Sequence, residues 1–449
     1  MSRVLVRDAL LFDGATVRAG VDLLVEDGVV AAIGATPGDG GAVAPGGAVA
    51  SDGAGVIDAA GRLVTPGLVN AHTHAYSTLA CGIALKDAPP ADFVQTLERL
   101  WWRLDRALGL RDIELSARLH AVAGLHAGVT CVFDHHASQA NVAGSLAALA
   151  DGFLAAGQRA CVCFEVSDRG GEDAASAGIA ENARGLDRAA AMPGDRLRAL
   201  VGLHASLTLS DATLAACRRL AEDHGTGCHV HVAEAVADQA DALRRSGRRV
   251  IERLAQAGVL GPRTICVHGV HLDDAERALL GASGSWLVHC PQSNMNNAVG
   301  AANLQLLGDA GVRLALGTDG FTADPRRDAL CAHLLQNHAA GDPRAGWAQV
   351  PRLLFHANAE LARETFAAGL GRLQVGDPAD LTVWDYLPAT PLDAENLHGH
   401  LMFGLTHARA ADVFVGGEQV LANGRATRLD EAALRAECRA AAAALWERF

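Results

Sequence analysis

The sequence contains almost no lysine and no paired cysteine motif. Lys86 is the one lysine in 449 residues, and every other basic side chain is arginine. The ten cysteines are scattered through apolar stretches, for example Cys161 and Cys163, without any Cys-x-x-Cys spacing. This pattern argues against a structural zinc site or a disulfide framework and favours buried, reduced thiols in a cytoplasmic protein.

Long hydrophobic runs and a positive charge balance are also missing. No apolar run approaches the roughly 20 residues of a membrane span, and the first residues lack the apolar core of a signal peptide. The formal net charge of −13 disfavours nucleic acid and anionic membranes as partners. What remains is a chain that is half hydrophobic and long enough for two domains, or for one large barrel with an appendage.

Apolar β-like runs alternate with helical patterns through the middle of the chain, which indicates a parallel α/β fold. Eight such runs are present: 63–76, 130–136, 159–168, 197–207, 227–234, 264–272, 285–291 and 312–320. Eight βα units over roughly 300 residues favour a (β/α)8 TIM barrel. A doubly wound open sheet is the competing architecture, but no Gly-rich dinucleotide or phosphate loop supports it.

Short β-like runs also flank this central region. The sequence therefore predicts the first part of a composite β-sandwich at 1–64, the barrel at 65–370, the second part of the sandwich at 371–428 and a C-terminal helix at 429–449. The two outer parts are expected to complete one β unit, since neither alone makes a stable sheet. Residues 35–55 are rich in Gly and Ala and are expected to form a surface loop.

A His-x-His pair, His72 and His74, lies near the carboxyl end of the first central run. Residues i and i+2 of a strand point to the same face, so both imidazoles can reach one metal ion. With 19 histidines in the chain about one such pair is expected by chance. Two more pairs, at 229–231 and 398–400, are in fact present, and the last lies outside the barrel region.

The active site of a barrel is built where its strands end, at the carboxyl face. Polar residues of ligand or acid/base type recur at that end of seven of the eight runs: His72 and His74, 134–136, His204, His231 and Glu234, His268, 289–294, and Asp319. Each alone is compatible with a satisfied polar side chain or with turn chemistry. Packing does not explain why they coincide at one end of otherwise apolar strands.

Three motifs match a known family: Pro66–His74 (PGLVNAHTH), His231–Glu234 (HVAE) and Gly317–Asp319 (GTD). The chain resembles the amidohydrolase superfamily over essentially its whole length. Within it, the chain is similar to the branch of metal-dependent aminohydrolases and chlorohydrolases that includes guanine deaminase, S-adenosylhomocysteine deaminase and the s-triazine hydrolases. Longer stretches at 100–105, 134–138 and 289–300 are most similar to the aminohydrolases called SsnA.

The resemblance implies four ligands for one divalent metal ion: His72, His74, His231 and Asp319. Three imidazoles and one carboxylate leave a position open for water, as catalytic zinc sites require, and ferrous iron is the alternative to zinc. The resemblance also implies that His268 pairs with Asp319 and handles the proton of the water, and that Glu234 shuttles a proton to the ring or leaving group.

The lysine content agrees with a single metal ion. Members of the superfamily with two metals bridge them through a carboxylated lysine on the fourth strand. Here the fourth run carries His204, and Lys86 lies in the loop after the first run. The bridge is unavailable, so a mononuclear site is expected.

Five residues are candidate substrate contacts: His204, Trp102, His135, Gln292 and Asn294. Trp102 either stacks on a planar heterocycle or packs its helix onto the barrel. The predicted reaction on this small-molecule substrate is hydrolytic deamination of a nitrogen heterocycle with release of ammonia. Ring opening of a cyclic amide and hydrolysis of a C–Cl bond are the enzymatic alternatives, and a scaffold with an unused metal site is the non-enzymatic one. By analogy with relatives a homodimer is expected.

Overall fold

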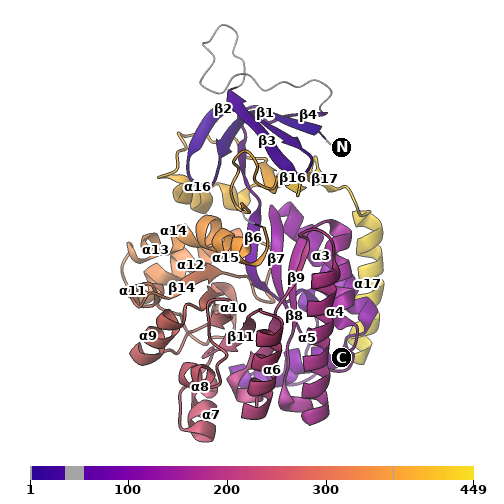
Figure 1. Cartoon of the computed structure of the whole chain (residues 1–449), viewed down its shortest axis with the longest axis vertical. Coiled ribbons are helices and arrows are strands. Elements are labelled where there is room, and N and C mark those ends of the chain that lie inside the picture. The colour runs from indigo at the N-terminus through magenta and orange to yellow at the C-terminus, as the bar shows by residue number, and fades with distance from the viewer. Residues whose placement is uncertain (1–2, 36–54, 368) are drawn as a thin grey trace.

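The protein is described by a computed structural model that covers residues 3–35, 55–367 and 369–449. A β-sheet unit sits at one end of the long axis and an α/β body forms the rest (Figure 1). The N-terminal strands and the strands near the C-terminus lie together in the sheet unit, so the chain leaves this unit, builds the body and returns.

The sheet unit is one mixed sheet of nine strands in the order β18-β17-β16-β15-β5-β1-β2-β3, with β4 beside β1. Its strands are β1 (Arg3–Phe12), β2 (Val17–Glu26), β3 (Val29–Ala35), β4 (Gly55–Asp58), β5 (Leu63–Pro66), β15 (Leu381–Trp384), β16 (Ala410–Val415), β17 (Glu418–Ala422) and β18 (Arg425–Ala426). Strand β5 lies between β1 and β15 and so joins the two halves of the chain, as expected. The loop expected at 35–55 lies, except for its two end residues, outside the described residues.

This sheet does not divide into two separately hydrogen-bonded layers. Its edge strand β3 instead curls back towards the segment that precedes β15. There the N–H of Val30 donates to the carbonyl of Asp377 at 2.9 Å. A core of its own lies inside the turn and contains Leu23, Val64 and Phe414, all buried. The curled shape follows from the usual right-handed twist of strands accumulated over many neighbours.

Nine parallel strands form the body: β6 (Leu68–Thr73), β7 (Val129–His136), β8 (Arg159–Phe164), β9 (Leu197–Ala199), β10 (Val201–Ala205), β11 (Cys228–Val232), β12 (Ile265–His268), β13 (Trp286–His289) and β14 (Arg313–Leu316). They correspond to the eight predicted runs, because the fourth run is divided at Leu200 into β9 and β10. Strands β6 to β9 make one sheet and β10 to β14 make another.

Single bridges connect these two sheets at both edges. Thr73 pairs with Asp319 at one seam, and Val166 pairs with Leu203 at the other. The ladder of hydrogen bonds is therefore not continuous around the strands, which differs from the closed barrel that the alternation predicted. The local reason at the first seam is the backbone of Asp319, whose φ of 54° takes it out of the strand conformation.

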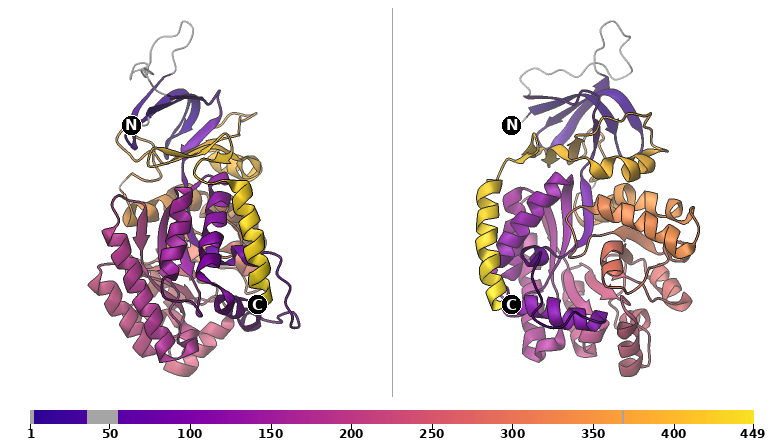
Figure 2. Two further views of the ribbon diagram at one scale, coloured as in Figure 1. Left: turned by 90° about the vertical axis from the view of Figure 1, so that its right-hand side faces the viewer. Right: turned by 180° about the vertical axis from the view of Figure 1, so that it is seen from behind.

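Helices follow the strands: α1 (Phe93–Thr96), α2 (Trp102–Ala107), α3 (Leu110–His126), α4 (Ser145–Ala156), α5 (Glu172–Ala191), α6 (Asp211–Asp223), α7 (Val236–Ser246), α8 (Val250–Gln256), α9 (Asp274–Ser283), α10 (Pro291–Asn296), α11 (Leu304–Asp309), α12 (Pro325–Ala340), α13 (Ala345–Ala348), α14 (Val350–Arg352), α15 (Asn358–Thr365), α16 (Leu397–Phe403) and α17 (Glu431–Arg448). The C-terminal helix α17 runs beside α3 on the outside of the body (Figure 2). In the described part of the chain, none of these helices has the length and apolar character needed to cross a membrane.

The sheet unit and the body are joined by a buried ion pair. The guanidinium of Arg159, in the first position of β8, donates two hydrogen bonds to the carboxylate of Asp380, at 2.8 and 2.9 Å. Both side chains are almost fully buried. Asp380 also accepts the N–H of Gly416 at 2.7 Å, so one carboxylate fixes β8 and the turn after β16 together.

Candidate active site

Three imidazoles converge at the carboxyl ends of β6 and β11. His72 and His74 come from the end of β6 and His231 from β11, and their ligand nitrogens all lie within 4.8 Å of one another. The Nε2 atoms of His74 and His231 are 3.3 Å apart, and Oδ1 of Asp319, just past β14, lies 3.4 Å from Nε2 of His74. The structure therefore brings the four predicted ligands into one cluster.

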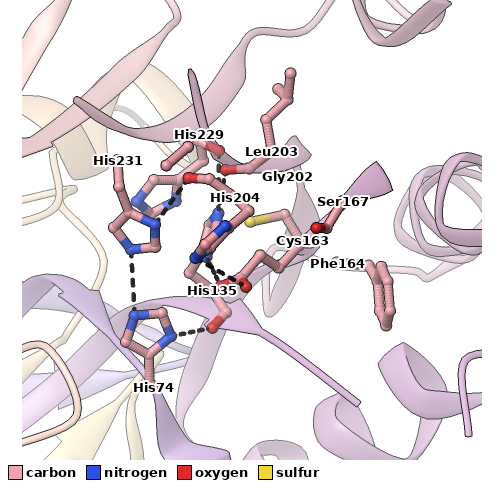
Figure 3. A network of polar contacts seen from close by, with 12 residues as sticks. His74, His135, Cys163, Phe164, Ser167, Gly202, Leu203, His204, His229 and His231 are labelled. Atoms are coloured by element: carbon pink, nitrogen blue, oxygen red, sulfur yellow. Dashed lines mark hydrogen bonds and ion pairs between the residues drawn. The ribbon is translucent and has the colours of Figure 1, made fainter. Parts of the chain in front are cut away.

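The second nitrogen of two of these imidazoles is held by the backbone (Figure 3). Nδ1 of His74 donates to the carbonyl of His135, and Nδ1 of His231 donates to the carbonyl of His204 at 2.9 Å. These bonds place the ring proton on Nδ1 and leave the lone pair of Nε2 free to bind a metal ion.

His72 is held by another side chain instead. Its Nδ1 lies 2.9 Å from Nε2 of His229 in a fully buried contact. Its Nε2 is buried and has no hydrogen-bond partner. An orphaned buried nitrogen aimed at two other imidazoles and a carboxylate is what a His3Asp site for a divalent ion requires, so these residues fit a metal ion.

The predicted acid/base residues lie against this cluster. Nε2 of His268 is 3.3 Å from Oε2 of Glu234 and 3.6 Å from Oδ2 of Asp319. Nδ1 of His268 is 2.9 Å from Nδ2 of Asn294. Because the amide nitrogen donates, Nδ1 accepts, and the ring proton of His268 lies on Nε2, facing the two carboxylates. Asn297 donates to Oε1 of Glu234 at 3.2 Å.

The two carboxylates have opposite environments. Burial, together with the charge of Asp319, raises the pKa of Glu234 well above its ordinary value. Burial also acts to raise the pKa of Asp319, but the neighbouring His74 and His268 outweigh it and leave that pKa lowered. A protonated Glu234 beside an ionised Asp319 is the separation of roles that acid/base catalysis needs.

Strained backbone marks the ends of three strands. Ala233, His268 and Asp319 have φ values of 47°, 75° and 54°, in the left-handed region that non-glycine residues rarely adopt. Each lies at or just past the end of β11, β12 or β14. This backbone conformation directs the side chains of Glu234, His268 and Asp319 towards the cluster. It costs conformational free energy, and strained residues of this kind are frequent at functional sites.

A cavity of about 720 Å³ opens above these residues. Its lower wall contains His74, His231, Glu234, His268 and Asp319. Its upper wall is mostly apolar and comes from the loop after η1 (Ala75–Ala80) and from α1, η2 (Leu97–Trp101) and α2, with Leu97, Leu100 and Trp101 among the side chains. The π-helical turn η2 lies directly between α1 and α2 in this part of the wall.

Two of the five predicted substrate contacts line this cavity, His204 and Trp102. Their rings meet edge to face with centroids 6.2 Å apart, and the guanidinium of Arg169 lies 4.6 Å from the Trp102 ring on which it stacks. Trp102 therefore lines the cavity with the Arg169 guanidinium stacked on part of its ring, and the rest of the ring is available to a planar ligand.

The other three predicted contacts lie behind the cavity wall. Nε2 of His135 faces backbone carbonyls, and the amide of Gln292 donates to Asp328 at 2.8 Å. Asn294 bonds to His268. None of these three side chains is among the residues that line the cavity.

Two residues near the cluster are missing from the sequence-based set. Glu165 follows β8 directly, lines the cavity and is only 4% exposed. His229 is hydrogen-bonded to His72, one of the predicted ligands. A signal for Glu165 was present in the sequence, since it is the first acidic residue after the apolar strand 159–164. For His229 only the His-x-His spacing with His231 was visible.

Comparison with known proteins assigns the family. A profile described as "Amidohydrolase family" matches residues 63–420. A 5'-deoxyadenosine deaminase of Methanopyrus kandleri is 30% identical over 373 residues, which cover 82% of this chain and 83% of that protein. A 5-methylthioadenosine/S-adenosylhomocysteine deaminase of Haloarcula marismortui is 31% identical over 401 residues, which cover 86% and 87%.

Solved structures agree with this result. An adenosine deaminase from Xanthomonas campestris with bound zinc superposes with a TM-score of 0.81 at 25% identity and covers 99% of this chain and 98% of that one. A triazine hydrolase variant superposes with a TM-score of 0.82 at 20% identity, over 98% and 100%, which shows the shared fold. The predicted family and enzyme class, a metal-dependent hydrolase of carbon–nitrogen bonds, are confirmed. This chain belongs to the amidohydrolase family.

Proposed function

We propose that the protein is a mononuclear deaminase that replaces an amino group of a purine-type heterocycle by oxygen and releases ammonia. The observation that carries this proposal is the contact of Glu234, His268 and Asp319 beside the three-histidine cluster at the floor of one cavity. Two relatives at 30% and 31% identity are named as deaminases of adenosine derivatives, which supports a purine ring as substrate.

The ligand set would hold one divalent ion, and zinc suits it best. Such an ion, when bound, supplies the Lewis acidity that makes water a nucleophile near neutral pH. The rings of His72, His74 and His231 keep their own protons away from the ion, since Nδ1 of each ring donates to a fixed acceptor.

The remaining residues manage two protons. Water contributes its oxygen to the ring carbon, and its protons must reach the ring nitrogen and the departing amine. The ionised Asp319 is placed to take the first proton from the water, and the Nε2–H of His268 faces its carboxylate. Glu234, whose pKa is raised by burial, is placed to give its proton to the ring nitrogen, then to take the remaining proton from the oxygen now bonded to the ring carbon and pass it to the departing amine. The proton held by Asp319 afterwards returns Glu234 to its starting state.

The test is Glu234→Gln, which keeps the size of the side chain but removes its proton. We expect ammonia release from aminopurines to fall by a factor of at least about 10³ while zinc binding is retained. Glu181→Gln is the matched control, because Glu181 is also a buried glutamate but caps the N-terminus of α4 away from the cavity. Activity retained in Glu234→Gln would show that Glu234 does not transfer the proton.

The products of the wild-type enzyme separate the alternative reactions. Ammonia with exchange of NH2 for oxygen establishes deamination. Gain of a whole water without ammonia means ring opening of a cyclic amide, and release of chloride means hydrolysis of a C–Cl bond. Zinc content measured on the same sample gives the number of ions per chain, for which the proposal requires one.

We also propose that the two parallel sheets together form the (β/α)8 barrel and that the curled nine-stranded sheet forms the composite β-sandwich. The segment boundaries are then 1–64 and 371–428 for the sandwich, 65–370 for the barrel and 429–449 for the last helix. A homodimer and a cytoplasmic location stay predictions.

A further inference from the structure

The roof of the cavity comes from one continuous segment, residues 75–107, which begins directly after the predicted ligand His74. It contains η1, a largely exposed loop at 81–92, and then α1, η2 and α2. Ile83 and Leu85 are the half-buried side chains of this loop that line the cavity. A loop with so little buried apolar surface gains little from packing, so its position depends on the contacts that hold it at its two ends.

One side of the loop is tied to α2. The later part of α2 is fixed to the body, because Asp105 accepts a hydrogen bond from Arg169 at 2.7 Å. Nη1 of Arg103, in the same helix, donates to the carboxylate of Asp87 in the loop at 2.6 Å. Arg99, one turn earlier, donates to two carbonyls of the loop at 2.8 and 3.2 Å.

The end of α17 lies beside the loop and contacts the roof before and after it (Figure 2). Before the loop, Nε1 of Trp446 donates to the carbonyl of Leu79 at 2.8 Å. The same ring lies over Gly82, 3.8 Å from the place that a Cβ would take. After the loop, the guanidinium of Arg103 lies 4.5 Å from the centroid of the Phe449 ring and donates to the carbonyl of that residue.

The end of α17 is itself fixed to the body. Leu445 is fully buried, and Nε of Arg448 donates to the carbonyl of Ala107, the last residue of α2, at 3.1 Å. Nη2 of Arg448 donates to Asp112, which also accepts the N–H of Gly109 at 2.7 Å at the start of α3. The last turn of α17 is therefore a fixed support on the outer side of the loop.

We propose that Trp446 and Phe449 are positioning residues of the active site, which hold the loop at 81–92 closed over the cavity. Neither is among the described residues that line the cavity, so both act through the roof. Leu79 belongs to the same short helix as Tyr76, a side chain of the cavity wall. The loop opens to admit substrate and closes to exclude water. Only the kinetic part of the test rests on the proposed deaminase function.

The single lysine of the chain makes the position of this loop measurable. Lys86 is exposed and lies in the loop, so a protease that cleaves after lysine cuts the chain at one bond, between residues 86 and 87. The protease must draw several residues into its own active site, so the rate of cleavage follows the population with a released loop. We expect cleavage of the zinc-loaded wild type to depend only weakly on urea below the unfolding transition, since local opening exposes little surface.

Trp446→Phe keeps an aromatic ring but removes the hydrogen bond to Leu79, and cleavage should become about 5-fold faster. Phe449→Ala should act in the same direction from the other side of the loop, and it serves as the second variant if Trp446→Phe does not fold. Glu437→Gln is the matched control, because it removes the ion pair of α17 with Arg111 on α3 and leaves both loop contacts in place. Its rate of cleavage should equal that of the wild type.

The double variant Trp446→Phe/Phe449→Ala tests the consequence for the reaction. Part of the binding free energy of the substrate is then used to close the loop, so KM for adenosine or guanine should rise several-fold while kcat and zinc content change by less than about twofold. An unchanged KM would refute the positioning role.

Three cleavage results would overturn the inference: both single variants cut at the wild-type rate, Glu437→Gln cut as fast as they are, or a steep urea dependence in the wild type, which means global unfolding. Absence of ammonia from every aminopurine would instead overturn the proposed function and leave the cleavage results unaffected.

Discussion

Replacing His229 by Phe tests how the predicted metal ligand His72 is supported. If Nε2 of His72 binds the metal, its Nδ1 must carry the proton and donate to Nε2 of His229, 2.9 Å away. Phenylalanine fills the space of the imidazole but accepts no hydrogen bond, and His72 is 0% exposed, so water has no access to replace it. An unsatisfied buried donor costs about 1–3 kcal/mol, which corresponds to roughly 5- to 150-fold weaker metal binding.

The measurement is competition for zinc with a chelator of known affinity, together with the visible spectrum of the cobalt-substituted protein. His229→Gln is expected to recover part of the affinity, because its amide oxygen is able to accept from His72. His136→Phe is the matched control: it removes another fully buried strand-end imidazole, which bonds to Ser138 at 3.0 Å and not to a ligand. Equal zinc affinity in His229→Phe and wild type would refute the assigned support.

Three further outcomes are expected. Removal of zinc by a chelator lowers Tm, and added zinc restores it, because a ligand bound only by the folded state stabilises that state; an unchanged Tm would contradict a folded-state metal site. Asp380→Ala removes two hydrogen bonds from the buried guanidinium of Arg159, leaves the more distant carboxylate of Asp195, at 3.6 Å, as its ion-pair partner, and lowers the free energy of unfolding in urea by about 3 kcal/mol, with little change in kcat at 25 °C. Burial lowers the pKa of His120 to about 4, so the unfolded chain takes up the proton first as pH falls below 6.5 and this side chain costs about 2 kcal/mol of stability between pH 7 and 5. His120→Gln should remove that part of the loss in urea titrations at the two pH values.

The sequence predicted the elements that depend on short-range patterns. Each of the eight apolar runs contains a strand, and the polar residues at their ends meet at one face because parallel strands share a direction. The ligand cluster followed from this rule and from the family motifs. Helical patterns say less about where a helix ends: Gly247, with φ of 66°, ends α7 and separates it from α8 within one continuous helical pattern.

The direction of single side chains was not predictable. Asn294 and Gln292 follow a strand end that carries polar residues, yet their amides turn to His268 and Asp328 and not to the cavity. Glu165 shows the same limit, because its place in the cavity wall beside His135 and His204 depends on contacts between separate strands.

The predicted metal ligands come from both parallel sheets of the body. His72 and His74 belong to the four-stranded sheet, whereas His231 belongs to the five-stranded sheet and Asp319 follows its last strand. Between β6 and β14 the backbones are joined by the bridge of Thr73 and Asp319 and by bonds to the carbonyl of His72, and side-chain bonds between Asn70 and Thr318 add to them. An ion held by all four ligands would link the two sheets at this seam, and the apoprotein lacks that link. Amide hydrogens at the seam should therefore exchange faster in the apoprotein than those at the centre of either sheet.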